Sequence, residues 1–134
     1  MKAESAVSIC DTFRQQSFWT WNQLRRAKLV RSQLLEETIT DMNLLEIKTM
    51  CGPQVVTATF SKKREGDSGG DWEWWFTGRS KKWLSFRIQA KVLNISKAVY
   101  EHIDYAPGGR FQVERLIQSC QNATPKRSFA VFCG

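Results

Sequence analysis

The sequence predicts an α/β fold in which helices flank a mixed central sheet. Apolar side chains recur at helical spacing near the N-terminus and again within residues 111–120. Between them, residues 54–92 are rich in β-branched and aromatic side chains that alternate with polar ones. The expected order is helix, three strands, helix and strand. At 134 residues the chain has the length of a single domain, 1–134.

The N-terminal segment, about 8–35, is expected to be helical with a basic outer face. Its apolar residues at helical spacing are Phe13, Phe18, Trp21, Leu24 and Leu29. The core is expected to span about 36–134. It opens with a helix that starts near Thr40-Asp41, or at the capping-box-like Thr38, and stops at Gly52-Pro53. The stripe that this helix buries is Leu44, Leu45 and Ile47.

Three strands are expected to follow. The first is QVVTATFS (54–61), and the Gly-rich, charged SKKREGDSGG after it is expected to be a loop. The second, DWEWWFTG (71–78), alternates so that Asp71, Glu73 and Trp75 share one face, while Trp72, Trp74 and Phe76 share the buried one. After the turn GRSKK comes WLSFRIQAKVL (83–93), whose polar face holds Arg87, Gln89 and Lys91.

The last third of the chain is expected to hold two helices and a strand. ISKAVYEHI (95–103) reads as a short helix, YAPGGR as a loop and FQVERLIQSC (111–120) as a helix. RSFAVFC is expected to be a buried strand stopped by Gly134. Because this strand ends abruptly, truncation of the domain or its completion by a partner subunit are both open.

Charge and composition limit the function classes. The net charge of +7 and pI of about 9.5 favour a polyanionic partner. No apolar run approaches the ~18 residues of a membrane span, and MKAESAVSICDTF lacks an apolar h-region, so secretion is not expected. Four scattered cysteines are expected to be buried thiols in a reducing cytoplasm. A single histidine and the absence of a P-loop argue against a Ser-His-Asp hydrolase and a nucleotide hydrolase.

Four polar residues on the second and third strands suggest a metal site. Two residues of strand rise put the carboxylates of Asp71 and Glu73 about 7 Å apart. If the strands form a hairpin, Gln89 and Lys91 project beside them, and such oxygen donors suit Mg²⁺ or Mn²⁺. Spacing alone equally allows a half-exposed strand whose acids pair with their cross-strand neighbours. Gly69-Gly70 directly before Asp71 favours the site.

The motifs ETITDMNLLEI, GGDWEWWF, RIQAK and FQVERLI resemble the PD-(D/E)XK nuclease superfamily, in its Mrr-like Asp…Gln-x-Lys form and within an uncharacterised bacterial family. The resemblance covers about residues 36–132. It implies a restriction-endonuclease-like α-β-β-β-α-β core and a metal-dependent nuclease in bacterial defence.

The resemblance also implies roles for individual residues. Asp71 and Gln89 would hold Mg²⁺ or Mn²⁺, Lys91 would be the catalytic lysine, and Glu36 or Glu37 would be an additional metal-binding acid. Glu73 would be an extra ligand or a partner of Lys91. Gln89, where the family usually has an acid, leaves a catalytically inactive binding or assembly module open as an alternative.

The expected partner is nucleic acid, most simply double-stranded DNA, with a homodimer or a partner subunit also open and no membrane contact. The residues expected to hold phosphates are Lys62, Lys63, Arg64, Arg79, Lys81 and Lys82. We expect Gln112 to be an exposed first-turn residue, and Trp83 to pack in a core or an interface.

Overall fold

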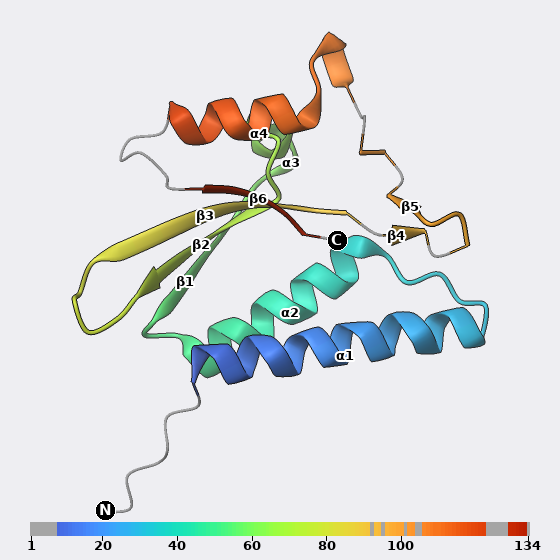
Figure 1. The fold of residues 1–134 in the computed structure, drawn as a ribbon, viewed down its shortest axis with the longest axis horizontal. Coiled ribbons are helices and arrows are strands. Elements are labelled where there is room, and N and C mark those ends of the chain that lie inside the picture. Colours follow the sequence, from blue (N-terminus) through green and yellow to red (C-terminus); the bar gives the residue numbers. More distant parts are fainter. Residues whose placement is uncertain are drawn as a thin grey trace, which may run out of the picture. The chain divides into compact units, whose positions relative to one another are not determined.

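The computed structural model describes residues 8–91, 93–94, 96–100, 102–103, 106–122 and 129–133. In these ranges the chain divides into two compact units, the first ending at Val56 and the second beginning at Thr57. Helices and strands occur together, so the predicted α/β class is confirmed (Figure 1). The prediction of one domain stays a prediction.

The first unit is a pair of antiparallel helices, α1 (Ile9–Leu29) and α2 (Glu36–Cys51) (Figure 1). Ser8 caps α1 by accepting a hydrogen bond from the Asp11 amide, as N-cap serines do. Asn43 Nδ2 donates to Thr20 Oγ1 at 2.7 Å and joins the two helices. The predicted N-terminal helix is therefore confirmed.

The start predicted for α2 was wrong by one turn. The helix begins at Glu36 rather than near Thr40, and two acids in its first turn interact favourably with the helix dipole. Leu44 and Ile47 are buried as expected, whereas Leu45 is 56% exposed. The helix ends before Gly52, as the sequence indicated.

A four-stranded sheet follows, with its strands ordered β1-β2-β3-β6, and all of it except the first two residues of β1 belongs to the second unit. Their bounds are β1 (Val55–Thr59), β2 (Trp72–Thr77), β3 (Trp83–Ala90) and β6 (Phe129–Cys133). β2 and β3 form an antiparallel hairpin, and β6 runs parallel to β3. The four predicted strands are confirmed, although the side chains of β6, and so its predicted burial, lie outside the described residues.

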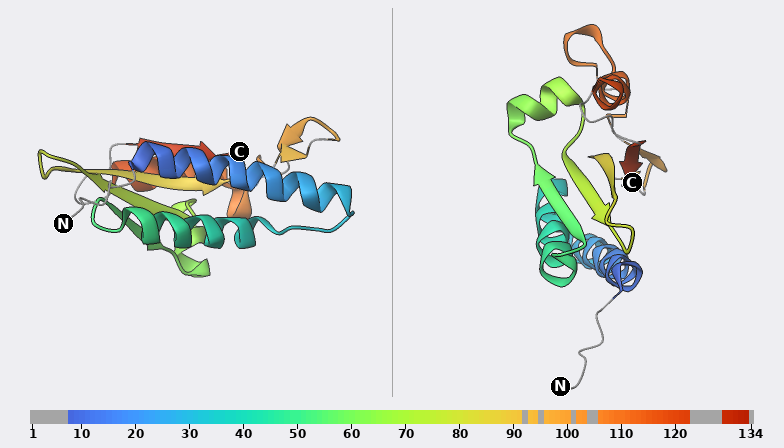
Figure 2. Two further views of the ribbon diagram at one scale, coloured as in Figure 1. Left: turned by 90° about the horizontal axis from the view of Figure 1, so that it is seen from below. Right: turned by 90° about the vertical axis from the view of Figure 1, so that its left-hand side faces the viewer.

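Two helices accompany this sheet, α3 (Lys62–Ser68) and α4 (Gln112–Gln121). α4 packs against β3 and β6, and α3 packs against α4, so both lie on the same side of the strands (Figure 2). The buried apolar side chains of the unit include Trp72, Ile88 and the fully buried Leu116. The rings of Trp72, Trp74 and Phe76, which share one face of β2, pack edge to face along the strand.

Two local predictions were wrong. The segment predicted as a charged loop contains α3, because Ser61 caps its start and Gly69, at φ 70°, closes its end in the left-handed region that glycine adopts freely. The short helix predicted at 95–103 is replaced by a two-stranded ribbon, β4 (Leu93–Asn94) and β5 (Val99–Tyr100). Asn94 Oδ1 accepts from the Lys97 amide in its turn. A 3-10 turn, η1 (Pro107–Gly109), precedes α4.

Candidate functional site

Asp71 and Gln89 meet at one end of the β2–β3 hairpin. The Asp71 amide donates to the Ile88 carbonyl at 2.7 Å, which extends the ladder by one residue and fixes the backbone. Asp71 Oδ2 accepts from the Ala90 amide at 2.8 Å and from Gln89 Nε2 at 2.9 Å. The structure thus brings together the two residues that the sequence singled out first.

Gln112, the first residue of α4, adds a third member. Its Nε2 donates to Gln89 Oε1 at 2.5 Å, so a chain of hydrogen bonds runs from α4 through β3 to Asp71. The expectation that Gln112 is exposed was wrong: the residue is partly buried, and its Oε1 is buried with no hydrogen-bond partner among the described residues. Only its place at the start of the helix signalled this role.

The charge environment of Asp71 is mixed. Burial raises the pKa of Asp71 above its ordinary value, and the nearby carboxylate of Glu65 raises it further. The Ala90 amide, the Lys91 ammonium and the Gln89 amide act in the opposite direction. Lys91 directly follows β3 and is partly buried. Glu65, on α3, is a neighbour that sequence reasoning missed, because its segment was read as a loop.

Glu73 is held in a buried ion pair. Its Oε1 accepts from Arg87 Nε at 2.9 Å and also from Arg87 Nη2, and its Oε2 accepts from Trp75 Nε1 at 3.1 Å. Both side chains are almost fully buried, with exposures of 2% for Glu73 and 6% for Arg87. The Arg87 guanidinium also lies 5.3 Å from the centre of the Phe60 ring. These contacts give Glu73 a structural task, and its catalytic role stays a prediction.

The other acids predicted to bind metal belong to a different unit. Glu36 and Glu37 form the first turn of α2, and their metal-binding role stays a prediction. Within the described ranges no three His, Cys, Asp or Glu side chains form a group that could hold a metal ion. A cation bound at Asp71 would therefore take amide oxygens as well as carboxylate oxygens.

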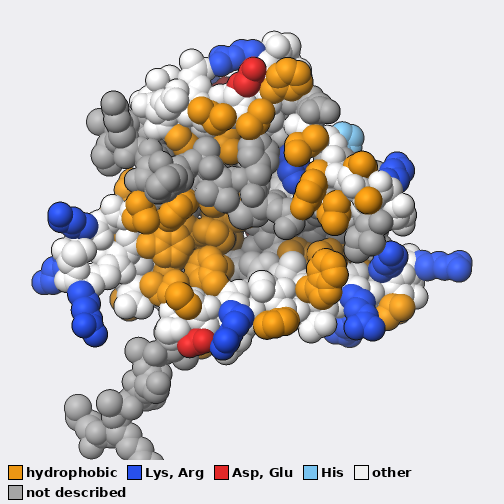
Figure 3. Space-filling view, in the orientation of Figure 1, with side chains coloured by type: hydrophobic (Ala, Val, Ile, Leu, Met, Phe, Trp, Pro, Cys, Tyr) orange, Lys and Arg blue, Asp and Glu red, His pale blue; other side chains and the backbone are white. Residues whose placement is uncertain are grey.

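The predicted phosphate-binding residues lie in two places. Lys62, Lys63 and Arg64 open α3, where Lys62 Nζ lies 3.8 Å from Glu65 Oε2. Arg79, Lys81 and Lys82 form the exposed turn between β2 and β3. Figure 3 shows blue side chains projecting at its left-hand edge, where Figure 1 places this turn.

Trp83 follows this basic turn and is 50% exposed. This exposure excludes packing of Trp83 in the core, and packing in an interface stays a prediction.

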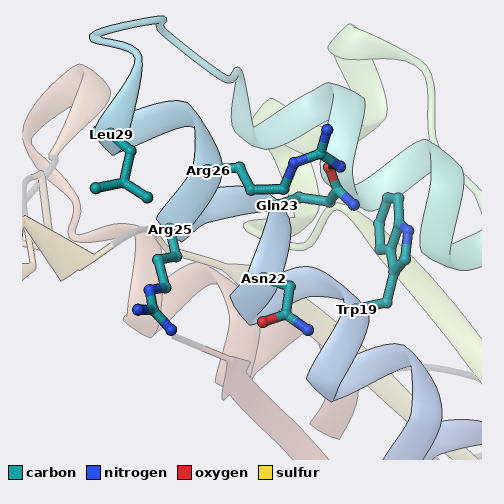
Figure 4. A pocket seen from close by; sticks show the side chains of 6 residues that line it. All are labelled: Trp19, Asn22, Gln23, Arg25, Arg26 and Leu29. Carbon is teal, nitrogen blue, oxygen red and sulfur yellow. Dashed lines mark hydrogen bonds between the residues drawn. The ribbon is translucent and has the colours of Figure 1, made fainter.

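A pocket lies along α1 (Figure 4). Arg26 and Gln23 lie side by side there, with 3.5 Å between Nη1 and Oε1. The residues that line the pocket are Trp19, Asn22, Gln23, Arg25, Arg26 and Leu29. Since the lining contains cations and amides but no carboxylate, hydroxyl or thiol, it offers an anion contact rather than a catalytic group.

The cysteines differ from one another. Cys51 and Cys120 are buried thiols, as predicted, whereas Cys10 is exposed, so the expectation of four buried thiols was wrong. The side chain of Cys133 lies outside the described residues. None of the helices in the described part of the chain has the length and apolar character that crossing a membrane requires.

Comparison with known proteins gives a family but no activity. Residues 9–133 match the family of unknown function DUF6615. The match covers nearly the whole chain, so the protein belongs to this family. None of the curated proteins matches the chain.

Proposed function

We propose that this member of DUF6615 is a metal-dependent nuclease of the PD-(D/E)XK type that hydrolyses phosphodiester bonds, most simply in DNA. The observation that carries the proposal is the hydrogen-bonded pair of Asp71 and Gln89, with the Lys91 cation beside it. The order α2, β1, β2, β3, α4, β6, with β3 and β6 parallel, supports it because this order is the one expected of that nuclease core. α3 is an additional element.

The donor set suits a hard cation. Asp71 Oδ1 accepts no hydrogen bond from any described residue, and Oδ2 holds the carboxylate in place. Gln89 Oε1 accepts one bond from Gln112 and keeps a second lone pair, and Gln112 Oε1 is buried without a partner. Carboxylate and amide oxygens are the ligands that Mg²⁺ and Mn²⁺ prefer.

The protein groups have separate tasks in hydrolysis. A bound Mg²⁺ or Mn²⁺ lowers the pKa of water and stabilises negative charge on a phosphate. Asp71 must be ionised to bind it, and Gln89 and the Ala90 amide orient its carboxylate. The Lys91 ammonium neutralises charge that develops on the phosphate or orients the attacking water. The cations of α3 and of the β2–β3 turn bind the phosphate backbone.

The pathway and the compartment are part of the same proposal. Cleavage of foreign DNA in bacterial defence is the biological role that we propose, on the resemblance alone. We place it in the cytoplasm, where the buried thiols of Cys51 and Cys120 stay reduced.

Cleavage of supercoiled plasmid tests the proposal. The wild-type protein should nick or linearise the plasmid in Mg²⁺ or Mn²⁺, and EDTA should stop the reaction. Lys91→Ala should lower the rate by at least about 100-fold, the usual contribution of a positioned acid–base or charged group. Lys97→Ala, an exposed lysine in the β4–β5 turn, is the matched control. Cleavage that persists in EDTA, or a fully active Lys91→Ala protein, would refute the proposal.

One observation favours a second candidate, a binding module without cleavage. Gln89 Nε2 donates to Asp71 and Gln89 Oε1 accepts from Gln112, so both polar atoms of the Gln89 side chain are already hydrogen-bonded within the protein. Salt-dependent DNA binding with no cleavage in either metal would establish this second function.

A further inference from the structure

The β2–β3 turn ends in an exposed tryptophan. Between Phe76 and Arg87 the chain has three cations, Arg79, Lys81 and Lys82, and no acid. The indole of Trp83 comes directly after them and is half exposed. A surface with cations and an aromatic face but no carboxylate is complementary to a nucleic-acid strand, because the cations bind phosphates and the ring offers a face to a base.

The turn holds a defined conformation. The Lys81 amide donates to the Gly78 carbonyl at 3.0 Å, and Thr77 Oγ1 donates to the Lys82 carbonyl at 3.0 Å. Lys81 itself has φ 55°, a region where a non-glycine residue is uncommon. A cation thus stands where glycine would fit with less strain. Because these hydrogen bonds already fix the backbone of the turn, little backbone conformational entropy is lost when a ligand binds here.

The strand register links Trp83 to Asp71 and Gln89. Trp83 pairs with Thr77, and Arg87 pairs with Glu73, so Trp83, Arg87 and Gln89 lie on one sheet face by two-residue alternation. Gln89 lies six positions after Trp83 along β3. At about 3.3 Å per residue the tryptophan lies roughly 20 Å from Gln89.

We propose that the β2–β3 turn binds single-stranded nucleic acid, with one unpaired base stacked on Trp83 and the neighbouring phosphates on Arg79, Lys81 and Lys82. A duplex hides the faces of its bases, so an exposed indole at the tip of a ribbon selects unpaired ones. The second part of the proposal rests on the proposed nuclease function. The length of the hairpin holds the stacked base at a fixed distance of roughly 20 Å from the phosphodiester bond that is cleaved.

Binding is measured first, in EDTA, so that no cleavage occurs. Fluorescence anisotropy of a labelled single-stranded oligonucleotide is recorded for the wild type, Trp83→Ala, Trp83→Phe and Trp21→Ala. Trp21, on α1, is 59% exposed and serves as the matched control. We expect Trp83→Ala to weaken binding about 5- to 100-fold, Trp83→Phe to retain most of the affinity, and Trp21→Ala to change it less than about twofold. DNA and RNA strands of the same sequence show which sugar the turn accepts.

Blunt duplex of the same sequence separates stacking from charge. Trp83→Ala should change the affinity for duplex less than about twofold, because Arg79, Lys81 and Lys82 remain to bind phosphates. Equal losses on single strand and duplex, or no loss on either, would overturn the proposal. A Trp83-dependent preference for single strands in a protein that cleaves nothing would leave the binding surface intact and refute only the nuclease function.

The distance is tested in an active preparation by moving one abasic site along a single strand. At about 3.4 Å per stacked nucleotide, the largest loss of cleavage is expected roughly six nucleotides from the cut. A loss of cleavage that does not depend on the position of the abasic site would refute the proposed distance.

Discussion

Removing the carboxylate of Glu73 is expected to destabilise the protein strongly. Glu73→Ala deletes every hydrogen bond that this carboxylate accepts from Arg87 and Trp75, and leaves a guanidinium that is 6% exposed without its counter-ion. Breaking a buried ion pair in this way costs about 3–5 kcal/mol. The Phe60 ring lies beside Arg87 in both proteins, so its cation–π contact does not change this difference. We therefore expect a loss of about 3–5 kcal/mol.

Chemical unfolding followed by circular dichroism measures this loss. A decrease of that size is a large part of the ~5–15 kcal/mol that stabilises a typical domain. The double variant Glu73→Leu/Arg87→Met is the control, and it should recover most of the stability because no charge is left buried. If Glu73→Ala unfolds within about 1 kcal/mol of the wild type and nevertheless abolishes metal-dependent cleavage, the structural role is refuted. Glu73 would then act on metal or substrate, as the sequence resemblance implies.

Two further outcomes are expected from residues around the same strands. Asp71→Asn should gain stability relative to the wild type as pH rises. Burial raises the pKa of Asp71 in the folded protein, so the folded state holds the proton more tightly than the unfolded state. The free energy of unfolding of the wild type therefore decreases as pH rises from the ordinary pKa of Asp71 to the raised one. Urea unfolding of both proteins from about pH 4 to 7 measures the difference, and a difference that stays constant with pH would contradict it. Gly69→Ala should lose roughly 2 kcal/mol or more, because its Cβ would lie 2.5 Å from the Gln112 carbonyl oxygen in a left-handed backbone. Gly66→Ala, inside α3 and with nothing within 4 Å of its Cβ, is the matched control and should be neutral or stabilising by up to about 1 kcal/mol in the same thermal melts.

The strands could be predicted because their pattern is local. Residues 71–74 alternate acidic and aromatic side chains, which is sufficient to place Asp71 on one face and Trp72 on the other. α3 could not be predicted because Lys62–Ser68 has no apolar stripe, and its helix is defined by the cap at Ser61 and the stop at Gly69. The β4–β5 ribbon was mistaken for a helix because short apolar runs fit either spacing.

The site could be predicted only in part. Asp71 and Gln89 were paired from the hairpin alone, but the partner of Glu73 depends on strand register, and register depends on the geometry of the turn. Gln112 contacts Gln89 across 23 residues of sequence, and its role follows from how α4 packs on β3. No pattern of neighbouring residues in the sequence indicates the pairing of Glu73 or the contact of Gln112.

The parallel pairing of β6 with β3 has a consequence for the order of folding. Trp83 pairs with Thr77 across a short turn. Phe86 pairs with Phe129, which lies 43 positions later in the chain (129 − 86). Closing the short loop is fast, and parallel pairing after a long connection is slow. The hairpin that holds Asp71 and Gln89 is therefore expected to pair early, and Gln112 and β6 join it later. A folding intermediate should thus contain the Asp71–Gln89 pair before the hydrogen bond from Gln112 has formed.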